Sequence, residues 1–281
     1  MIIVQLSGGI GNQMFQYAFA KALALKYKTK LVMDVREFSV SDPSITPRKF
    51  SLDAFRLKST LFEDIQEEQL PDDFTLVEDI SPLYYDENII HRVTKNSYLC
   101  GIWQSWRYFQ HIETVIRKNF RFTLLDFKRQ NLFLADVIRN SQSVSIHIRR
   151  TDYLHPRWAM NGALPKSYYD QAIQYISRWV SHPVFYVFLD DPDWAESNII
   201  TPHETHIIRG NSDAEDLFLM TQCKHNIIAN STFSWWGAWL NTSQRKINLA
   251  PSKWFLGLDT RLSQPDILLP DWIKIQIDGK M

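Results

Sequence analysis

The sequence predicts an α/β protein of two domains, each built on a parallel sheet. Short apolar runs rich in β-branched residues alternate with helix-length segments at the N-terminus and again from about residue 144, which is typical of parallel sheets. The stretch between them has no such alternation, and 281 residues suffice for two domains of ordinary size. We therefore expect domains at residues 1–140 and 141–281 that face each other across a cleft.

The N-terminal part begins with a strand, a helix and a second strand. An apolar run at residues 2–6 ends in a Ser-Gly-Gly turn, a largely apolar helix is expected over 12–28, and a strand over 30–34. This order is a βαβ unit. Prolines interrupt the pattern from 35 to 96, where we expect only a short helix at 61–70.

Regular elements resume after residue 96. Residues 98–103 resemble a strand, and residues 105–119 and 131–139 resemble helices. The remaining elements alternate in type, with strands expected at 144–148, 184–189, 206–208, 226–229 and 246–250, and helices at 166–180, 214–222 and 233–241.

Charge and cysteine content exclude several classes of protein. Lys and Arg number 31, as do Asp and Glu, so no positive excess points to nucleic acid or to an anionic membrane. Cys100 and Cys223 lack a metal-binding spacing and are expected as free thiols of a reducing compartment. The N-terminus lacks a signal-peptide pattern, and no apolar run is long enough for a bilayer. We expect a cytoplasmic protein, with peripheral association at the inner face of the membrane left open.

A glycine turn follows the first expected strand, in the order Gly8-Gly9-Ile10-Gly11-Asn12-Gln13. Gly9 and Gly11 allow a ligand to approach the backbone, and the helix that begins here offers free N–H groups to an anion. One interpretation is a contact with a sugar nucleotide or its acceptor, and another is a plain structural turn. The third is a nicotinamide-cofactor site with Asp34 on the ribose, although Met14 stands where that fingerprint requires its third glycine.

The segment Ile146-His147-Ile148-Arg149-Arg150-Thr151-Asp152-Tyr153 places charged side chains directly after a buried strand. Ligands of α/β sheets bind at the carboxyl ends of strands. Adjacent side chains on an extended segment point to opposite sides, so we expect one arginine to face a phosphate while the other is held by Asp152 or packs elsewhere.

Two more expected strands end in polar residues. Asn230-Ser231-Thr232-Phe233-Ser234 follows the strand at 226–229, and its hydroxyls and the start of a helix predict an anion site. Asp190 and Asp191 follow the strand at 184–189, where they could accept hydrogen bonds from a guanine or a ribose. Asp191-Pro192-Asp193 also matches a metal-binding DxD, but an ordinary helix start is the favoured interpretation.

Together these segments resemble the bacterial-type α-1,2-fucosyltransferases, inverting enzymes of glycosyltransferase family 11. The resemblance covers essentially the whole chain through GGIGNQMFQYA at residues 8–18, HIRRTDY at 147–153, the strand ending in Asp190-Asp191, and NSTFSWWGAWL at 230–240. It implies a GT-B-like fold of two Rossmann-like domains with the active site between them. It also implies GDP-fucose as donor, bound mainly by the C-terminal domain, with no catalytic metal and no other cofactor.

The resemblance assigns roles by position. It makes Arg149 and Arg150 the candidates for contact with the pyrophosphate, and it places Asn12 of the opposite domain near the fucose or a phosphate. The remaining implied contacts are His147 with Asp190 or Asp191 near the guanosine, and Ser231, Thr232 and Ser234 at the phosphates.

The reaction so implied transfers L-fucose from GDP-β-L-fucose to the 2-hydroxyl of a galactoside, in the synthesis of a surface glycan such as O-antigen. Asp152 is the candidate general base, with an ion pair that orients an arginine as its competing role. Replacement of Arg150 by Ala is expected to nearly abolish turnover. The acceptor would be a galactose-terminated oligosaccharide or a lipid-linked glycan, chosen within residues 35–96. The alternatives are another fucosyl linkage and a nicotinamide-dependent oxidoreductase.

Overall fold

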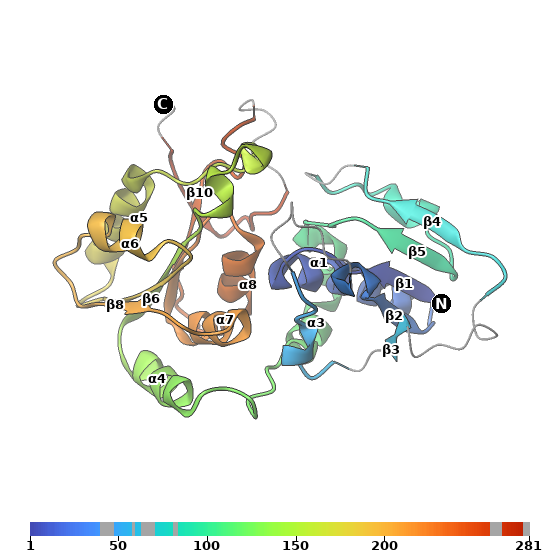
Figure 1. Ribbon diagram of the computed structural model, residues 1–281, viewed down its shortest axis with the longest axis horizontal. Coiled ribbons are helices and arrows are strands. Elements are labelled where there is room, and N and C mark those ends of the chain that lie inside the picture. The colour runs from blue at the N-terminus through green and yellow to red at the C-terminus, as the bar shows by residue number, and fades with distance from the viewer. Residues whose placement is uncertain (40–47, 58–59, 63–70, 81–83, 259–265, 278–281) are drawn as a thin grey trace. The chain divides into compact units, whose positions relative to one another are not determined.

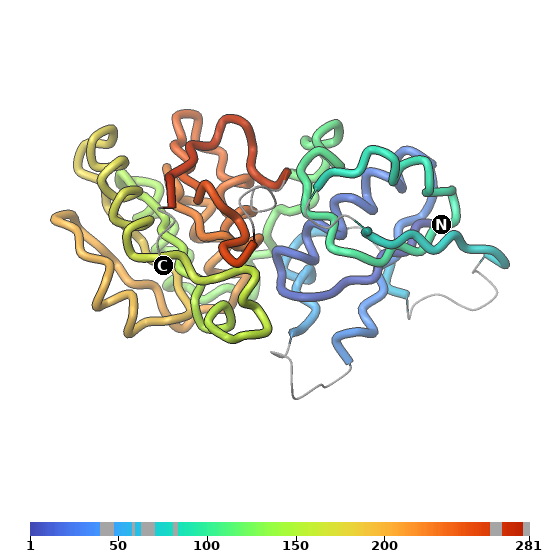
Figure 2. Tube along the Cα trace, turned by 90° about the horizontal axis from the view of Figure 1, so that it is seen from above, coloured from blue at the N-terminus to red at the C-terminus, as the bar shows by residue number. Residues whose placement is uncertain are grey.

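The computed structural model describes residues 1–39, 48–57, 60–62, 71–80, 84–258 and 266–277. The chain divides into two compact units, Met1–Leu124 and Leu125–Met281, and each is built on a sheet whose strand pairs are all parallel. In Figures 1 and 2 the first unit is coloured from blue to blue-green and the second from green to red. The expected α/β architecture of two parallel sheets is confirmed. No helix among the described residues is long and apolar enough to cross a membrane.

The first unit contains a five-stranded sheet with the order β3-β2-β1-β5-β4. Its strands are β1 (Ile2–Gln5), β2 (Leu31–Asp34), β3 (Thr60–Leu61), β4 (Thr75–Glu78) and β5 (Ser97–Cys100). β2 follows β1 on one side and β5 lies on its other side, so the strand order changes direction between β1 and β5. A crevice at such a switch point is where open α/β sheets bind ligands.

Helix α1 (Ile10–Lys26) connects β1 to β2 and is buried on most of its circumference. It begins two residues earlier than expected because Gly9 takes the extended N-cap position and Ile10 already forms the first turn. The expected helix over 105–119 is broken into short 3₁₀ turns, η5 (Trp106–Tyr108) and η6 (Gln110–Ile112), before α3 (Glu113–Asn119). A short helix α2 (Ile89–Arg92) precedes β5. The expected helix over 61–70 lies almost entirely outside the described residues.

The second unit contains a six-stranded sheet with the order β11-β10-β9-β6-β7-β8. Its strands are β6 (Ser143–Ile148), β7 (Val184–Leu189), β8 (Thr205–Ile208), β9 (His225–Ile227), β10 (Asn248–Pro251) and β11 (Ile273–Ile275). From β6 the chain adds β7 and β8 in one direction, and from β9 it adds β10 and β11 in the other. The switch point of this sheet therefore lies between β6 and β9.

Helices cover both faces of the second sheet. α5 (Lys166–Trp179) and α6 (Pro192–Asn198) lie on one face, and α7 (Asp213–Gln222) and α8 (Thr232–Leu240) lie on the other (Figure 1). Aromatic and aliphatic side chains of α5 pack on β6 and β7 to form a core from which water is excluded. This burial of apolar surface holds the carboxyl ends of the strands in place.

The boundary between the units falls after Leu124, earlier than the expected position near residue 140. Helix α4 (Arg129–Asn140), which lies between these two positions, belongs to the second unit because Glu215 of α7 binds its start. Oε1 of Glu215 accepts hydrogen bonds from the backbone N–H of Lys128 at 2.9 Å and from Nδ2 of Asn131 at 2.8 Å. Oε2 accepts from Ser212 and completes a capping box at the start of α7.

Glu215 should make the stability of the second unit depend on pH. Burial raises the pKa of this carboxyl, but hydrogen bonds from Lys128, Ser212 and Asn131 outweigh it and lower the pKa to about 2. Because folding lowers this pKa, the ionised carboxyl stabilises the folded state at pH values above its ordinary pKa. This stabilisation is lost as the pH falls through the pKa of the folded state. We expect Glu215→Gln to lower the free energy of unfolding at pH 7. The difference in free energy of unfolding between wild type and variant should shrink as the pH falls below about 4.5. Urea denaturation measures this difference, and a value that stays constant with pH would contradict the prediction.

Candidate active site

The switch point of the second sheet brings three polar segments to one edge. Residues 149–153 follow β6, Asp190 and Asp191 follow β7, and residues 230–234 follow β9. β6 pairs with both β7 and β9, so these three segments leave neighbouring strands. The structure thus brings together the candidates that lie far apart in the sequence, as the parallel arrangement predicts.

Arg149 is held between two carboxylates. Its Nη2 donates to Oδ2 of Asp152 at 2.5 Å, and its Nε lies 3.3 Å from Oδ2 of Asp190. Burial opposes the charge of Arg149, but these two carboxylates outweigh it and raise the pKa. The side chain keeps 23% of its surface exposed, so a charged guanidinium is both fixed in place and accessible to a ligand.

Arg150 points the other way, toward α6. Its Nε lies 3.1 Å from Oδ2 of Asp191, and its guanidinium stacks over the ring of Trp194 at 4.2 Å from the centroid. Its backbone N–H donates to Oδ1 of Asp190 at 2.9 Å. A cation on an aromatic face beside a carboxylate is a stable packing arrangement. Arg150 therefore packs against α6, and Arg149 is the more exposed of the two arginines, at 23% against 15%. Contact of either arginine with a phosphate stays a prediction.

Asp190 and Asp191 bind groups of the protein rather than presenting unpartnered carboxylates. Asp190 accepts from the hydroxyl of Thr151 at 2.9 Å in addition to its contacts with the two arginines. Asp191 caps α6 by accepting from the backbone N–H of Trp194 at 3.2 Å. The expected contacts of these carboxylates with guanosine stay predictions, while the observed contacts give both residues a role in placing the arginines. The alternative of a helix start at Asp191-Pro192 is confirmed by α6.

His147 lies beneath this edge of the sheet on the side of α8. Its ring is 5.2 Å from that of Phe233, and its Nδ1 is buried without a hydrogen-bond partner among the described residues. Burial and the positive charge of Arg149 lower the pKa of His147 to about 3. The imidazole is therefore neutral at physiological pH. Arg149 lowers the pKa of His147 because residues two apart on an extended segment lie on the same face.

The start of α8 carries the polar residues Ser231 and Thr232. Ser231 takes the N-cap position, but its hydroxyl makes no capping hydrogen bond within the part of the chain that the structure describes. Thr232 begins the helix with part of its surface exposed. Backbone N–H groups at a helix start carry partial positive charge, so this end suits a phosphate.

The other two candidates of this segment have structural partners. Nδ2 of Asn230 donates to the carbonyls of Asn161, Gly162 and Trp254 at 2.9–3.0 Å. The hydroxyl of Ser234 is fully buried and donates to the carbonyls of Ala229 and Ser231. These contacts favour a role in shaping the turn rather than direct contact of Ser234 with a phosphate.

The glycine turn of the first unit lies at the switch point between β1 and β5. Gly8 has a φ of +70°, and a Cβ there would lie 2.8 Å from Nδ2 of Asn12. Gly9 is the extended N-cap of α1, and Gly11 is buried in the first turn of that helix. Oδ1 of Asn12 accepts a hydrogen bond from Nε2 of Gln104, beyond the end of β5, at 3.1 Å. Contacts of this turn with a ligand stay predictions.

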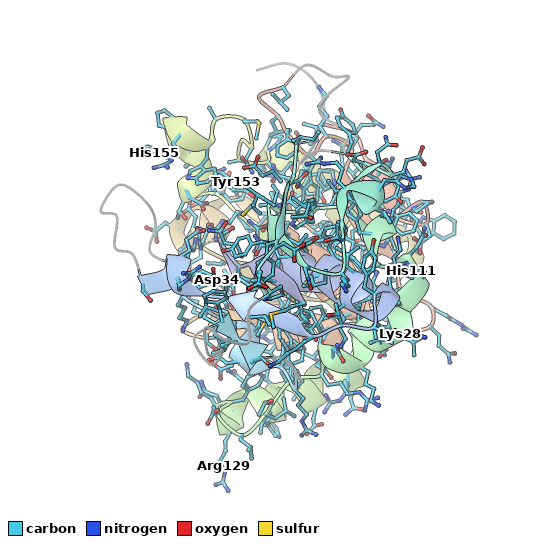
Figure 3. The ribbon with its side chains drawn as sticks, turned by 90° about the vertical axis from the view of Figure 1, so that its right-hand side faces the viewer. Lys28, Asp34, His111, Arg129, Tyr153 and His155 are labelled. Atoms are coloured by element: carbon cyan, nitrogen blue, oxygen red, sulfur yellow. The ribbon has the colours of Figure 1, made fainter. Side chains whose placement is uncertain are left out.

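Asp34, labelled in Figure 3, does not present a free carboxylate to a ribose. Arg36 donates to both of its oxygens at 2.9 and 2.6 Å, and the hydroxyl of Tyr98 donates to Oδ2 at 2.5 Å. Its side chain is 3% exposed. These contacts disfavour the nicotinamide alternative. Across the described residues, no group of three or more His, Cys, Asp or Glu side chains could hold a metal ion.

The sequence as a whole matches one family. The model of the family described as Glycosyl transferase family 11 covers residues 1–276. The chain belongs to glycosyltransferase family 11. Membership makes it a glycosyltransferase and removes the oxidoreductase alternative.

Proteins of bacteria and mammals align with nearly all of this chain. The O-antigen biosynthesis glycosyltransferase WbnK of Escherichia coli is 31% identical over 96% of this chain and 99% of its own length. The α-1,2-colitosyltransferase of Escherichia coli is 31% identical over 98% and 99%. Galactoside α-(1,2)-fucosyltransferase 2 of Pongo pygmaeus is 27% identical over 96% of this chain and 78% of its own length.

Solved structures agree on the fold of this family 11 chain. The crystal structure of NodZ α-1,6-fucosyltransferase soaked with GDP-fucose matches with a TM-score of 0.51, over 88% of this chain and 94% of NodZ. At 14% identity the match shows the fold alone. With the two parallel sheets, it confirms the GT-B-like α/β fold expected from the sequence.

Sequence reasoning missed the residues that orient the family 11 candidates. Trp194 beneath Arg150 and Gln104 beside Asn12 lie outside the motifs, and in each unit only the folded sheet brings such a residue beside its candidate. Gln13 and Gln16 lie within the quoted motif, where two polar residues on a buried helix are a visible signal. Gln13 donates to the carbonyl of Gly8 at 2.9 Å, and Gln16 accepts from the N–H of Ser7 at 3.0 Å, so both fix the glycine turn.

Gln104 should set which end of the Asn12 amide faces a ligand. Its donated hydrogen bond turns Oδ1 toward Gln104 and Nδ2 toward the glycine turn. Gln104→Glu removes the donor, and we expect kcat/KM to fall roughly ten-fold, the size typical of coupled neighbours. In an Asn12→Ala background the same change should have no further effect. Equal losses in both backgrounds would show that Gln104 acts independently of Asn12.

Proposed function

We propose that this chain transfers L-fucose from GDP-β-L-fucose to the 2-hydroxyl of a galactose-terminated glycan, with inversion at the fucose and without a metal. The galactoside α-(1,2)-fucosyltransferases among its relatives support both the sugar and the linkage. A crystal of NodZ, which shares the fold, was soaked with GDP-fucose, and this supports the donor class. The name of WbnK supports a role in O-antigen synthesis.

The observation that carries this proposal is that Arg149, directly after β6, and the start of α8, after β9, leave neighbouring strands at one edge of the sheet. Departure of fucose leaves negative charge on the diphosphate of GDP. A guanidinium donates two hydrogen bonds to phosphate oxygens, and the N–H groups at the start of α8 add further donors. These groups are held in place before the reaction, and such preorganised stabilisation is usually the largest single contribution to catalysis.

The remaining residues of the site place and tune this cation. Asp152 and Asp190 hold Arg149, while Asp191 and Trp194 hold Arg150. The neutral His147 adds no charge, and its Nδ1 is buried without a hydrogen-bond partner among the described residues. The acceptor hydroxyl attacks the face of fucose opposite the leaving diphosphate, and this gives inversion.

Transfer of colitose is the second candidate function. The α-1,2-colitosyltransferase of Escherichia coli is 31% identical to this chain over almost its full length, whereas the mammalian fucosyltransferase is 27% identical. Colitose is fucose without the 3-hydroxyl, so a site that holds fucose has room for colitose. Competition between GDP-fucose and GDP-colitose for one glycan acceptor, followed by mass spectrometry of the product, decides between them.

The test of the proposed function is GDP release from GDP-fucose with lactose as acceptor, with and without EDTA. We expect release that requires lactose and is unchanged by EDTA, and NMR of the product should show fucose on the 2-hydroxyl of galactose. Loss of activity in EDTA would overturn the metal-free mechanism. A product with fucose on another hydroxyl would overturn the linkage.

A further inference from the structure

We propose that residues 154–160 of the second unit form the platform on which the acceptor sugar stacks, with Trp158 as the stacking ring. We call this segment the acceptor platform. The inference rests on the proposed function because it names the place where that reaction holds its acceptor. The platform lies outside residues 35–96, where sequence reasoning placed acceptor choice.

The acceptor platform begins two residues after Asp152, and all seven of its residues are exposed. Three of them are large and apolar, with relative exposures of 59% for Leu154, 40% for Trp158 and 43% for Met160. Three large exposed apolar side chains within seven residues favour a ligand or partner at this segment over three unrelated surface residues. The platform is therefore a surface for binding, continuous in sequence with the Arg149–Asp152 pair.

The inner side of the acceptor platform is fastened to the start of the α8 segment. The hydroxyl of Tyr153 donates to the carbonyl of Asn230 at 3.1 Å. Nδ2 of Asn230 in turn donates to the carbonyls of Asn161 and Gly162, just beyond the other end of the platform. Figure 3 labels Tyr153, just before the platform, and His155 within it. One buried asparagine thus links both ends of the platform to the proposed phosphate site.

A second set of contacts fixes the far end of the acceptor platform. The N–H of Gly257 donates to the carbonyl of Met160 at 3.0 Å, and the N–H of Leu256 donates to that of Asn161 at 3.1 Å. A Cβ on Gly257 would lie 2.4 Å from the carbonyl oxygen of Ala159, so only glycine permits this approach. The backbone under Trp158 is consequently held from both sides.

Local turns hold the tip of the acceptor platform. The 3₁₀ turns η7 (Asp152–Leu154) and η8 (Pro156–Trp158) follow each other directly, and Nδ1 of His155 caps the second by accepting from the N–H of Arg157 at 3.2 Å. Pro156 restricts the chain further. An aromatic ring on a fixed backbone loses little freedom on binding, and this favours recognition of a ligand.

The chemistry of the acceptor platform fits a neutral sugar. Galactose has one face of C–H groups that packs on an aromatic ring, while its hydroxyls seek polar neighbours, and Trp combines an apolar face with a polar N–H. His155 and Arg157 alternate with the apolar residues and supply such polar neighbours. The cationic part of the site suits the anionic donor, so the adjacent uncharged ring is left for the uncharged acceptor.

The test compares Trp158→Ala with Trp158→Phe in the transfer assay, using Trp179→Ala as the matched control. Trp179 ends α5 and is 71% exposed, so Trp179→Ala removes an exposed indole elsewhere on the same unit. We expect Trp158→Ala to raise the KM for lactose roughly ten-fold, the value of one aromatic stacking contact. The affinity for GDP-fucose should stay unchanged, Trp158→Phe should recover most of the loss, and Trp179→Ala should behave as wild type.

Saturation-transfer NMR with lactose provides a readout that does not require turnover. If Trp158→Ala loses the saturation that wild type transfers to the galactose ring, the platform is supported. If wild type releases no GDP from GDP-fucose, the proposed function is overturned, but this NMR result still supports the platform. Unchanged lactose saturation and KM in Trp158→Ala overturn the platform while the function stands. Loss of binding to phosphatidylglycerol vesicles, with the lactose KM unchanged, would identify the segment as a membrane contact and also overturn the inference.

Discussion

Replacing Arg149 by Ala should reduce kcat for transfer from GDP-fucose by about 100- to 1000-fold, the effect of removing one preorganised donor to developing negative charge. The guanidinium is fixed by Asp152 and Asp190 and remains partly exposed, so its loss removes charge from the site itself. Steady-state kinetics with saturating lactose measures the effect. Arg149→Lys should recover little, because an ammonium cannot form the paired hydrogen bonds of a guanidinium.

Arg150→Ala is the matched control for this prediction. Sequence reasoning expected this variant to be nearly inactive, but the side chain packs on Trp194 and Asp191, so its loss should act mainly on stability. We expect a lower midpoint of thermal unfolding and a smaller decrease in kcat than for Arg149→Ala. A larger loss of kcat in Arg150→Ala, with the fold intact by circular dichroism, would reverse the roles assigned to the two arginines.

Replacing Asp152 by Ala should reduce kcat by about 100-fold, the loss expected when a catalytic group is displaced by an ångström or so. Asp152 is the nearer of the two carboxylates that hold Arg149, with 2.5 Å between Oδ2 and Nη2. Asp152→Asn retains an oxygen that accepts the same hydrogen bond, so it should recover much of the activity.

The dependence of kcat on pH separates this orienting role from general-base catalysis. A base must be deprotonated, so its protonation makes the rate fall at low pH. If Asp152 orients Arg149, Asp152→Asn should lower the rate at every pH and leave the shape of the profile unchanged. Loss of the decline at low pH, with a decrease of 10²- to 10⁴-fold, would identify Asp152 as the base.

The sequence predicted the frame of the site because its signals are local. Alternating apolar runs give the positions of β6, β7 and β9. In a parallel sheet the carboxyl ends of all strands lie along one edge. Helix starts were predicted at Asp191 and near Ser231 from residue type alone. These rules located the three polar segments without any knowledge of their mutual contacts.

The division of roles within the site could not be predicted because it depends on contacts between distant segments. The side chains of Arg149 and Arg150 were expected to point to opposite sides of the segment. Only the positions of α6 and α8 in the fold show which of these sides suits a phosphate. Trp194 shows the limit most clearly, since its ring supports Arg150 from a helix more than forty residues later. The break of residues 105–119 into short turns likewise follows from tertiary packing that propensity alone does not show.

Hydrogen–deuterium exchange on addition of GDP-fucose tests the central claim, that the donor binds at the switch point between β6 and β9. The account predicts slower exchange at residues 149–153 and in the first turn of α8, with the same protection by GDP and none in Arg149→Ala. Protection confined to the glycine turn and the neighbourhood of Asp34, with residues 149–153 and α8 unchanged, would contradict it.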